Sequence, residues 1–348
     1  MDLNRRELLL GLLAAAGPGA ELVHAGRPQG SVPVRPYRID IHHHFAPPAW
    51  VTAVKGRPLL QPANTTWTPA KSLEDMDRGG VASALVSITN PGLWFGDAPM
   101  TRALARACND YGATLVRDHP ARFGLFAAMP LPDVDGTLRE IEYALDTLKA
   151  DGIGLFTSYG DRWLGHADFR PVMEELHRRK AVVHVHPTAA NCCRNLEYAP
   201  GVAPGSIEYG TDTTRAITGV AFSGDAARFS GIRFIWSHAG GTAPFLASRI
   251  DGASRGARER MPAGFMATLK TFYYDLAGAT NAGAVASLLQ LVTPDRVLFG
   301  TDFPPGGAAA DYVTSIRELK MFSEAALRAV ERDNALGLLP RLAMVGQV

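Results

Sequence analysis

Eight short runs of apolar residues, each followed by a stretch with helical spacing, constrain the fold of this 348-residue chain more than any other feature. The runs have the length and composition of buried strands. They cover residues 38–43, 82–88, 123–127, 152–157, 181–186, 232–237, 272–276 and 297–300. The helices expected around them cover residues 72–77, 100–118, 136–149, 169–179, 213–222, 244–258, 282–291 and 310–322.

Regular alternation of strands and helices predicts parallel βαβ units. Eight such units in about 300 residues predict a single (β/α)₈ TIM barrel of the α/β class. An open, doubly wound sheet is the alternative. That alternative is disfavoured because no Gly-x-Gly-x-x-Gly motif follows the first run to form a nucleotide site.

The near balance of positive and negative residues limits the kinds of partner that the chain is expected to bind. Lys and Arg together number 35, Asp and Glu number 34, and the net charge is +1. Nucleic acids and anionic membrane surfaces reward a strong excess of positive charge, so neither is expected as the main partner. Apolar residues make up 47% of the chain, which allows a large core and excludes a mostly disordered protein. We therefore expect a small-molecule partner.

A basic and then apolar segment precedes the first strand. Arg5 and Arg6 stand before an apolar run over residues 8–16. Paired arginines in this position resemble a twin-arginine export signal, and the run is far shorter than the roughly 20 residues that span a bilayer. We expect a signal segment at residues 1–30 and a barrel domain at residues 31–348, with export to the bacterial periplasm or the exterior. The alternative is a disordered tail on a cytoplasmic protein.

Histidine or aspartate ends four of the eight predicted strands. His42 and His44 point to the same side of the first strand and His43 points away, because side chains alternate along a strand. His186, His238 and Asp302 lie at the ends of the fifth, sixth and eighth strands. Carboxyl ends of barrel strands meet at one rim, where active sites lie. Imidazoles with a carboxylate suit Zn²⁺ or a similar divalent ion, and three or four such ligands with an open position indicate a catalytic site.

Other polar residues near these ends are expected to support the site. His184 lies two residues deeper than His186, so it is interpreted as a core or supporting histidine. Asp40 precedes the histidine pair by two residues on the same face and is expected to be a supporting residue that orients an imidazole. No lysine ends the fourth strand to bridge a second ion, so one metal is expected.

Long segments that follow predicted strands are candidates for the pocket walls. They cover residues 45–68, 89–99 and 187–210. Trp94 and Phe95 in the second of them, and Tyr159 after the fourth strand, are expected to contact the substrate. Ordinary loop packing is the alternative for each.

The strand-end motifs together resemble the amidohydrolase superfamily. They are Asp40-x-His42-x-His44, His186-Pro187, the Ser-His-Ala-Gly-Gly of residues 237–241 and the Gly-Thr-Asp-Phe-Pro of residues 300–304. The branch that the chain resembles is the aminocarboxymuconate-semialdehyde decarboxylase group, with further matching segments at residues 76–81, 213–216, 272–275 and 334–336. Loop segments 91–97 and 157–163 are similar to those of 6-methylsalicylate decarboxylases.

The resemblance implies roles for individual residues. One Zn²⁺ would be held by four ligands, with Mn²⁺ as a possible alternative; the ligands are His42, His44, His186 and Asp302. His238 would act as the acid/base. Arg249 would reach a substrate carboxylate in the neighbouring subunit of a homodimer, the alternative being a salt bridge on its own helix. A second carboxylate-binding arginine of the family has no counterpart here, since Leu60 stands near its place, with Arg57 as the nearest arginine. This departure favours a substrate with a single carboxylate.

These roles lead to an expected reaction and its alternatives. The leading function is non-oxidative decarboxylation of a hydroxybenzoate that resembles 6-methylsalicylate, in which His238 or Asp302 protonates the ring carbon before carbon dioxide leaves. The same groups would serve a metal-dependent hydrolase of an ester, lactone or amide, because Zn²⁺ lowers the pKa of bound water toward 7. A third interpretation is a metal-binding or ligand-binding protein without catalytic activity.

Overall fold

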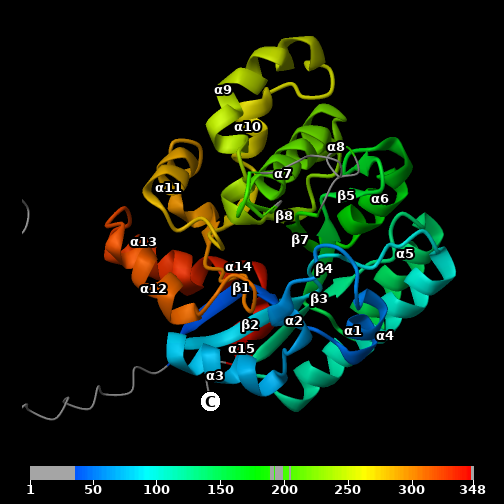
Figure 1. Cartoon of the computed structure of the whole chain (residues 1–348). Coiled ribbons are helices and arrows are strands. Elements are labelled where there is room, and N and C mark those ends of the chain that lie inside the picture. The colour runs from blue at the N-terminus through cyan, green and yellow to red at the C-terminus, as the bar shows by residue number, and fades with distance from the viewer. Residues whose placement is uncertain (1–35, 189–191, 193–198, 204, 346–348) are drawn as a thin grey trace, which may run out of the picture. The chain divides into compact units, whose positions relative to one another are not determined.

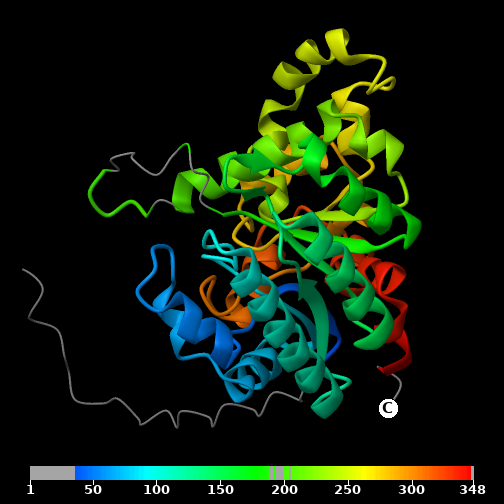
Figure 2. The same cartoon turned by 90° about the vertical axis from the view of Figure 1, so that its right-hand side faces the viewer.

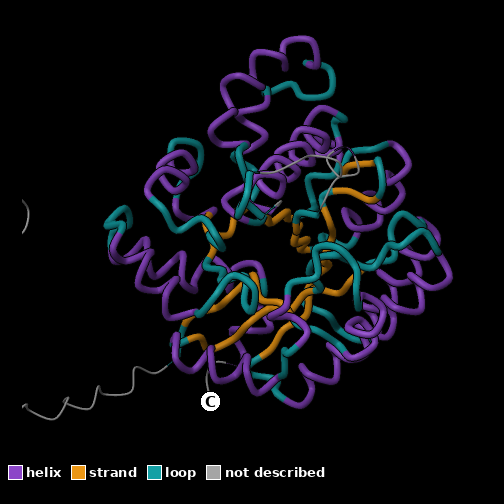
Figure 3. Tube along the Cα trace, viewed as in Figure 1, coloured by secondary structure: helices purple, strands orange, loops and turns teal. Residues whose placement is uncertain are grey.

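All eight predicted strands are present, with bounds within two residues of those expected. The structure, a computed structural model, describes residues 36–188, 192, 199–203 and 205–345. The strands are β1 (Arg38–His44), β2 (Val81–Ser87), β3 (Phe123–Ala128), β4 (Gly152–Phe156), β7 (Val182–His186), β8 (Arg233–Trp236), β9 (Tyr273–Asp275) and β10 (Val297–Leu298). They form one sheet in this order, and every pair is parallel. Figures 1 and 3 show them as a ring inside a layer of helices, which is the (β/α)₈ arrangement.

The ring closes between the segment after β10 and β1. The backbone N–H of Asp302 donates to the carbonyl of His42, and the N–H of His44 donates to the carbonyl of Phe303, both at 2.7 Å. An isolated parallel bridge joins His43 to Phe303. The contacts that complete the barrel therefore bring the segment after the last strand against the carboxyl end of the first.

Each predicted helix is also present. These helices are α3 (Pro69–Gly79), α4 (Ala98–Asp118), α5 (Val134–Glu142), α6 (Arg170–Arg178), α7 (Gly205–Phe222), α9 (Ala243–Ala253), α11 (Ala282–Leu289) and α12 (Ala309–Glu318). Capping residues determine where several helices begin and end. The Thr68 side chain accepts the Lys71 N–H and caps the start of α3. Gly80 ends α3 in the left-handed conformation, at φ 63°. Asp97 caps α4 in the same way by accepting the Met100 N–H.

Short elements in the connections were not predicted. They are α1 (Pro48–Val54), α2 (Pro62–Thr65), β5 (Ser158–Tyr159), β6 (Arg162–Trp163), α8 (Asp225–Arg228), α10 (Phe265–Leu269), α13 (Glu324–Arg328), α14 (Asn334–Leu338) and α15 (Pro340–Val345). In Figure 2 the blue segment after β1, which carries α1 and α2, lies at the same end of the barrel as the green segment after β7. The described parts of both segments therefore lie at the end of the barrel where the strands end.

The opposite end of the barrel is closed by α14 and α15. Leu338 and Leu342 from these helices pack in one apolar cluster with Ile41 and Phe126 from the strands. Arg341 donates to the carbonyl of Phe123 at the start of β3, which places α15 at the amino ends of the strands. The rim is thus the open end of the barrel.

The N-terminal segment predicted as an export signal, residues 1–30, lies outside the described residues. The described residues from 36 to 345 belong to one compact unit. In the described part of the chain, no helix combines the length and apolar character needed to cross a bilayer.

Candidate metal centre and active site

The first strand delivers two imidazoles to one point. His42 and His44 are fully buried, their rings meet edge to face, and their Nε2 atoms lie 3.1 Å apart. His43 lies elsewhere: its Nδ1 pairs with Asp40, its Nε2 pairs with Ser72, and its ring stacks on Phe303. The alternation expected for the three consecutive histidines is therefore confirmed.

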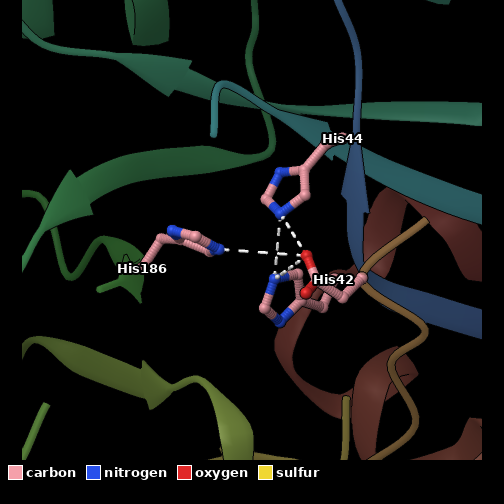
Figure 4. A group of neighbouring side chains, drawn as sticks. His42, His44 and His186 are labelled. Atoms are coloured by element: carbon pink, nitrogen blue, oxygen red, sulfur yellow. Dashed lines mark hydrogen bonds and ion pairs between the residues drawn. The ribbon is translucent and has the colours of Figure 1, made fainter. Parts of the chain in front are cut away.

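His186 and Asp302 complete the cluster. Oδ1 of Asp302 lies 2.8 Å from Nε2 of His44, 3.3 Å from Nε2 of His42 and 3.9 Å from Nε2 of His186. One donor atom from each of the four residues lies within 4.8 Å of all the others. Figure 4 shows the imidazoles of His42 and His44, both from β1, and that of His186, from β7, converging on one carboxylate oxygen.

Each of the three imidazoles is oriented by a hydrogen bond at Nδ1, while its Nε2 points into the cluster. Nδ1 of His44 lies 3.2 Å from the carbonyl of Ser87, and Nδ1 of His186 lies 2.8 Å from the carbonyl of Pro187. Nδ1 of His42 lies 3.0 Å from Oδ2 of Asp275. Such acceptors hold the proton on Nδ1 and leave the Nε2 lone pair for a metal ion. Nε2 of His186 is buried and has no hydrogen-bond partner, as expected for a ligand atom.

Burial and nearby charges shift the pKa values of the three histidines in different directions. Burial lowers the pKa of His44 to about 4 and that of His186 to about 3, so both are neutral near pH 7. Burial also acts to lower the pKa of His42, but the Asp275 and Asp302 carboxylates outweigh it and raise this pKa to about 10. For Asp302, burial acts to raise the pKa, yet His42 and the other histidines hold it well below its usual range. Without metal, a proton on His42 balances the carboxylates.

His238 lies beside the cluster but outside the ligand group. Its Nε2 is 3.5 Å from Oδ2 of Asp302, the oxygen that faces away from the other three histidines. Its side chain is 17% exposed and that of Asp302 is 20% exposed, so both are accessible from the rim, whereas the side chains of His42 and His44 are fully buried. This position suits a group that exchanges a proton with a bound molecule.

Asp275 organises the site, although the sequence analysis gave it no role of its own. Its Oδ2 lies 3.0 Å from both Nδ1 of His42 and Nε2 of His184, and its Oδ1 accepts the backbone N–H of His238 at 3.1 Å. One carboxylate therefore contacts both a candidate metal ligand, His42, and the candidate acid/base, His238. The only sequence signal was an aspartate at the end of the seventh strand, at the same rim.

Asp40 orients an imidazole, as expected, but that imidazole belongs to His43 and not to a candidate ligand; from His42, Oδ1 of Asp40 accepts only the backbone N–H. Its Oδ2 pairs with Nδ1 of His43 and accepts the Thr301 hydroxyl, so it orients the imidazole that turns away from the cluster. The pairing register of β1 shifts between Asp40 and His43, which breaks the simple alternation on which the expectation depended. His184 has the supporting position that was predicted, against Asp275 and stacked on Phe126.

The three aromatic residues expected to contact the substrate lie in different environments. Trp94 and Phe95 are partly buried in the segment after β2, and the guanidinium of Arg57 lies 3.6 Å from the centre of the Phe95 ring. Tyr159 is buried: its hydroxyl accepts the Phe156 N–H and its ring packs against Phe156, which in turn contacts His186. Substrate contact by Tyr159, like that by Trp94 and Phe95, stays a prediction.

Arg249 lies on an exposed part of α9. Among the described residues it has no ion pair or hydrogen-bond partner for its guanidinium, so the alternative of a salt bridge on its own helix finds no support there. The structure does not bring it to the cluster of its own chain. Its contact with a substrate stays a prediction.

A parallel barrel with three histidines and one aspartate converging at its rim is typical of metal-dependent enzymes built on a TIM barrel. Residues 39–341 match the Amidohydrolase family, and the chain belongs to it. It is 38% identical over 330 residues to a decarboxylase named yanB from Aspergillus niger, covering 88% of each chain. It is 35% identical over 324 residues to a 6-methylsalicylic acid decarboxylase from Penicillium expansum, covering 88% of this chain and 97% of the relative.

Solved structures agree on the fold. A 2,6-dihydroxybenzoate decarboxylase from Rhizobium superposes with a TM-score of 0.78 at 21% identity, covering 87% of this chain and 98% of that one. At this identity the superposition shows a shared barrel fold and nothing more. The family predicted from the strand-end motifs is confirmed.

Proposed function

We propose that this enzyme is a metal-dependent decarboxylase that removes carbon dioxide, without oxidation, from a hydroxybenzoate resembling 6-methylsalicylate. One observation carries the proposal. Asp302 presents one oxygen to three imidazoles and the other oxygen to His238. A metal-binding group and a proton-transfer group are thereby joined through one carboxylate. The decarboxylase relatives that share more than a third of their residues with this chain support this reaction over ester, lactone or amide hydrolysis.

The residues present fit a single divalent ion. Three imidazoles with their Nδ1 atoms anchored, one carboxylate and a buried Nε2 of His186 without a partner form a donor set suited to Zn²⁺. We propose Zn²⁺ as the bound ion, with Mn²⁺ as the alternative. The ligands would be His42, His44, His186 and Asp302. When bound, the ion would supply Lewis-acid stabilisation of the substrate's carboxylate and adjacent phenolic oxygen.

The chain's own groups move the proton. Nε2 of His238 and Oδ2 of Asp302 lie 3.5 Å apart on the side of the cluster that is open to the rim, where this pair would carry the proton for the reaction. This pair delivers the proton to the ring carbon that bears the carboxylate. The bond from this carbon to the carboxylate then breaks, its electron pair restores the aromatic ring, and carbon dioxide leaves. Reactant and products balance, because one proton is taken up for each carbon dioxide released.

The surroundings of the rim fit a small aromatic acid with one carboxylate. Trp94 and Phe95 offer apolar surface at the rim. Arg57 is engaged over the Phe95 ring and bonds the Ala53 carbonyl, so it is already committed elsewhere. A second carboxylate on the substrate would therefore lack a partner from this arginine.

We propose a homodimer in which Arg249 reaches the partner's site. Phe245, one helical turn before Arg249 on α9, is 79% exposed, and Ile207 on the neighbouring α7 is 54% exposed. The two helices are joined where the Thr242 N–H donates to the Gly210 carbonyl, and Figures 1 and 2 show α9 and α10 extending beyond the ring of helices. Large exposed apolar side chains beside an unpaired guanidinium are typical of a protein interface.

Export through a twin-arginine signal is proposed from the first residues alone. Lysine in place of Arg5 and Arg6 keeps the charge but removes the pair of arginines. A reporter fused to residues 1–30 should be exported, and the double lysine variant should stay in the cytoplasm. Equal export of both forms would indicate the general secretory route instead. Retention of the parent fusion would show that the segment is only a tail.

Product analysis tests the proposed reaction. The metal-loaded enzyme is incubated with a panel of hydroxybenzoates and matched aryl esters in D₂O, and the products are analysed by mass spectrometry. A decarboxylase yields a product that has lost carbon dioxide and carries deuterium at the carbon that bore the carboxylate. Gain of water on the esters, with the acids unchanged, would instead identify a hydrolase.

A further inference from the structure

One hydroxyl group joins the two segments that follow the last two strands. The backbone N–H of Gly278, after β9, donates to the Tyr312 hydroxyl at 3.2 Å. The same hydroxyl donates to the carbonyl of Gly306, after β10, at 3.0 Å. The Tyr312 side chain comes from α12, on the outer layer, so it ties the two segments from outside the site.

Each of these segments supports one of the groups proposed to move the proton. Gly278 has φ 61°, and a Cβ atom added there would lie 3.2 Å from Cδ2 of His238, so the bare backbone forms a wall beside that imidazole. The N–H of Gly306 donates to the carbonyl of Asp302 at 2.7 Å. The Tyr312 hydroxyl therefore reaches His238 through Gly278 and Asp302 through Gly306.

The backbone at both supported residues is strained. His238 has φ 55° and Asp302 has φ 57°, in the left-handed region that residues other than glycine rarely adopt. Such conformations persist only where the surrounding structure holds them. The hydroxyl of Tyr312 is one of the contacts that can do so for both segments at once.

Tyr312 is itself held firmly. It is 8% exposed, and the helix that carries it begins at Ala309, whose N–H donates to both oxygens of the buried Asp75 at 3.1 and 3.2 Å. Gly79 of α3 packs directly on Ala309, where any side chain would clash. The hydroxyl is thus fixed relative to the barrel, independently of the two segments that it joins.

We propose that Tyr312 is a positioning residue, whose hydroxyl sets the separation of His238 from Asp302 by tying their supporting segments to α12. It holds the 3.5 Å approach of the two side chains without touching the substrate. The catalytic part of this inference rests on the proposed function, while the positioning part concerns His238 alone. Its closest variant is Tyr312→Phe, which keeps the ring and removes both hydrogen bonds.

Steady-state kinetics and NMR on the zinc-loaded enzyme test the proposal. In Tyr312→Phe we expect kcat to fall by roughly tenfold, since small misplacement of catalytic groups is costly, with KM and zinc content unchanged. With ¹³C-labelled histidine, the His238 ring signal, assigned by its loss in His238→Gln, should broaden or double. Tyr143→Phe is the matched control, because its hydroxyl bonds Asp110 on the outer surface and should leave kcat and the His238 signal unchanged.

A second variant changes the contact between Gly278 and the His238 ring directly. Gly278→Ala pushes against the His238 ring and should reproduce the kcat loss and the altered signal with Tyr312 intact. An unchanged kcat and a single sharp His238 signal in Tyr312→Phe would overturn the proposal, as would a loss of zinc that accounts for the lost activity. If the wild type decarboxylates no hydroxybenzoate, the proposed function fails, and the His238 signal alone decides the positioning role.

Discussion

The backbone N–H of Asp302 donates a 2.7 Å hydrogen bond to the carbonyl of His42. This bond belongs to the closure of the barrel, and its two residues are also candidate metal ligands. Closing the barrel and assembling the ligand set are therefore the same structural event.

Each ligand substitution should cost the enzyme its metal, because the four donor atoms form one set. Elemental analysis of purified protein should show strongly reduced occupancy in His42→Ala, His44→Ala, His186→Ala and Asp302→Ala. Full occupancy in any of these variants would remove that residue from the set. His43→Ala should keep its metal but lose about 1–3 kcal/mol of unfolding free energy, because Asp40 and Ser72 lose their buried partner.

Metal binding should become tighter as pH rises through neutrality. The raised pKa of His42, about 10, means that this imidazole is protonated in the metal-free protein at pH 6.5–8. The lowered values for His44 and His186, about 4 and 3, mean that these are already neutral. An entering ion must displace one proton, so affinity should rise about tenfold per pH unit. Calorimetry in buffers of different ionisation enthalpy should count one proton released; zero would contradict the charged His42.

Asp275→Asn should weaken metal binding by about 10–100-fold, the usual effect of losing the group that orients a ligand. The amide keeps the shape but not the charge that His42 and His184 face. Asp40→Asn is the control: its carboxylate pairs with the ring of His43 instead, so this variant should lose stability while keeping metal affinity. Equal metal affinities of the two variants would remove Asp275 from this role.

His238→Gln should retain metal and lose most activity. Positioned acid–base groups contribute about 10²–10⁴-fold, and this side chain lies outside the ligand group. The comparison is kcat on the best hydroxybenzoate with metal content measured in parallel. Turnover near the wild-type rate would mean that His238 only supports the structure.

Arg249→Ala should raise KM or abolish turnover with metal intact, and Arg249→Lys should recover little because a point charge lacks the two-pronged guanidinium. The shared-site arrangement has its own test. Mixing Arg249→Ala with His238→Ala protein under subunit exchange should restore part of the activity, since some hybrid sites carry both intact residues. A fully active monomeric wild type, or an inactive mixture with proven exchange, would contradict it.

The strands and the grouping of the four candidate ligands were predictable for simple reasons. Buried parallel strands are continuous apolar runs, and their carboxyl ends meet at one rim, so residues as distant as His42 and Asp302 could be grouped from the sequence. The role of Asp275 was not predictable, because which imidazole a strand-end carboxylate reaches depends on the register across the barrel. Which imidazole Asp40 orients was not predictable either, because the register shift in β1 is invisible in the residue pattern. The two hydrogen bonds of Tyr312 link segments whose approach no motif indicates.

One candidate ligand, His42, lies in the first strand and another, Asp302, lies after the last strand, and this separation along the chain limits when an ion could be bound. Residue 302 leaves the ribosome about 260 residues after residue 42, and the hydrogen bonds that join them close the barrel. Metal capture must therefore follow translation of nearly the whole chain and late, long-range folding. A chain that crosses a membrane unfolded would find its ion on the far side, whereas one that crosses folded would carry the cytoplasmic ion with it. The route of export would then decide which metal the enzyme uses.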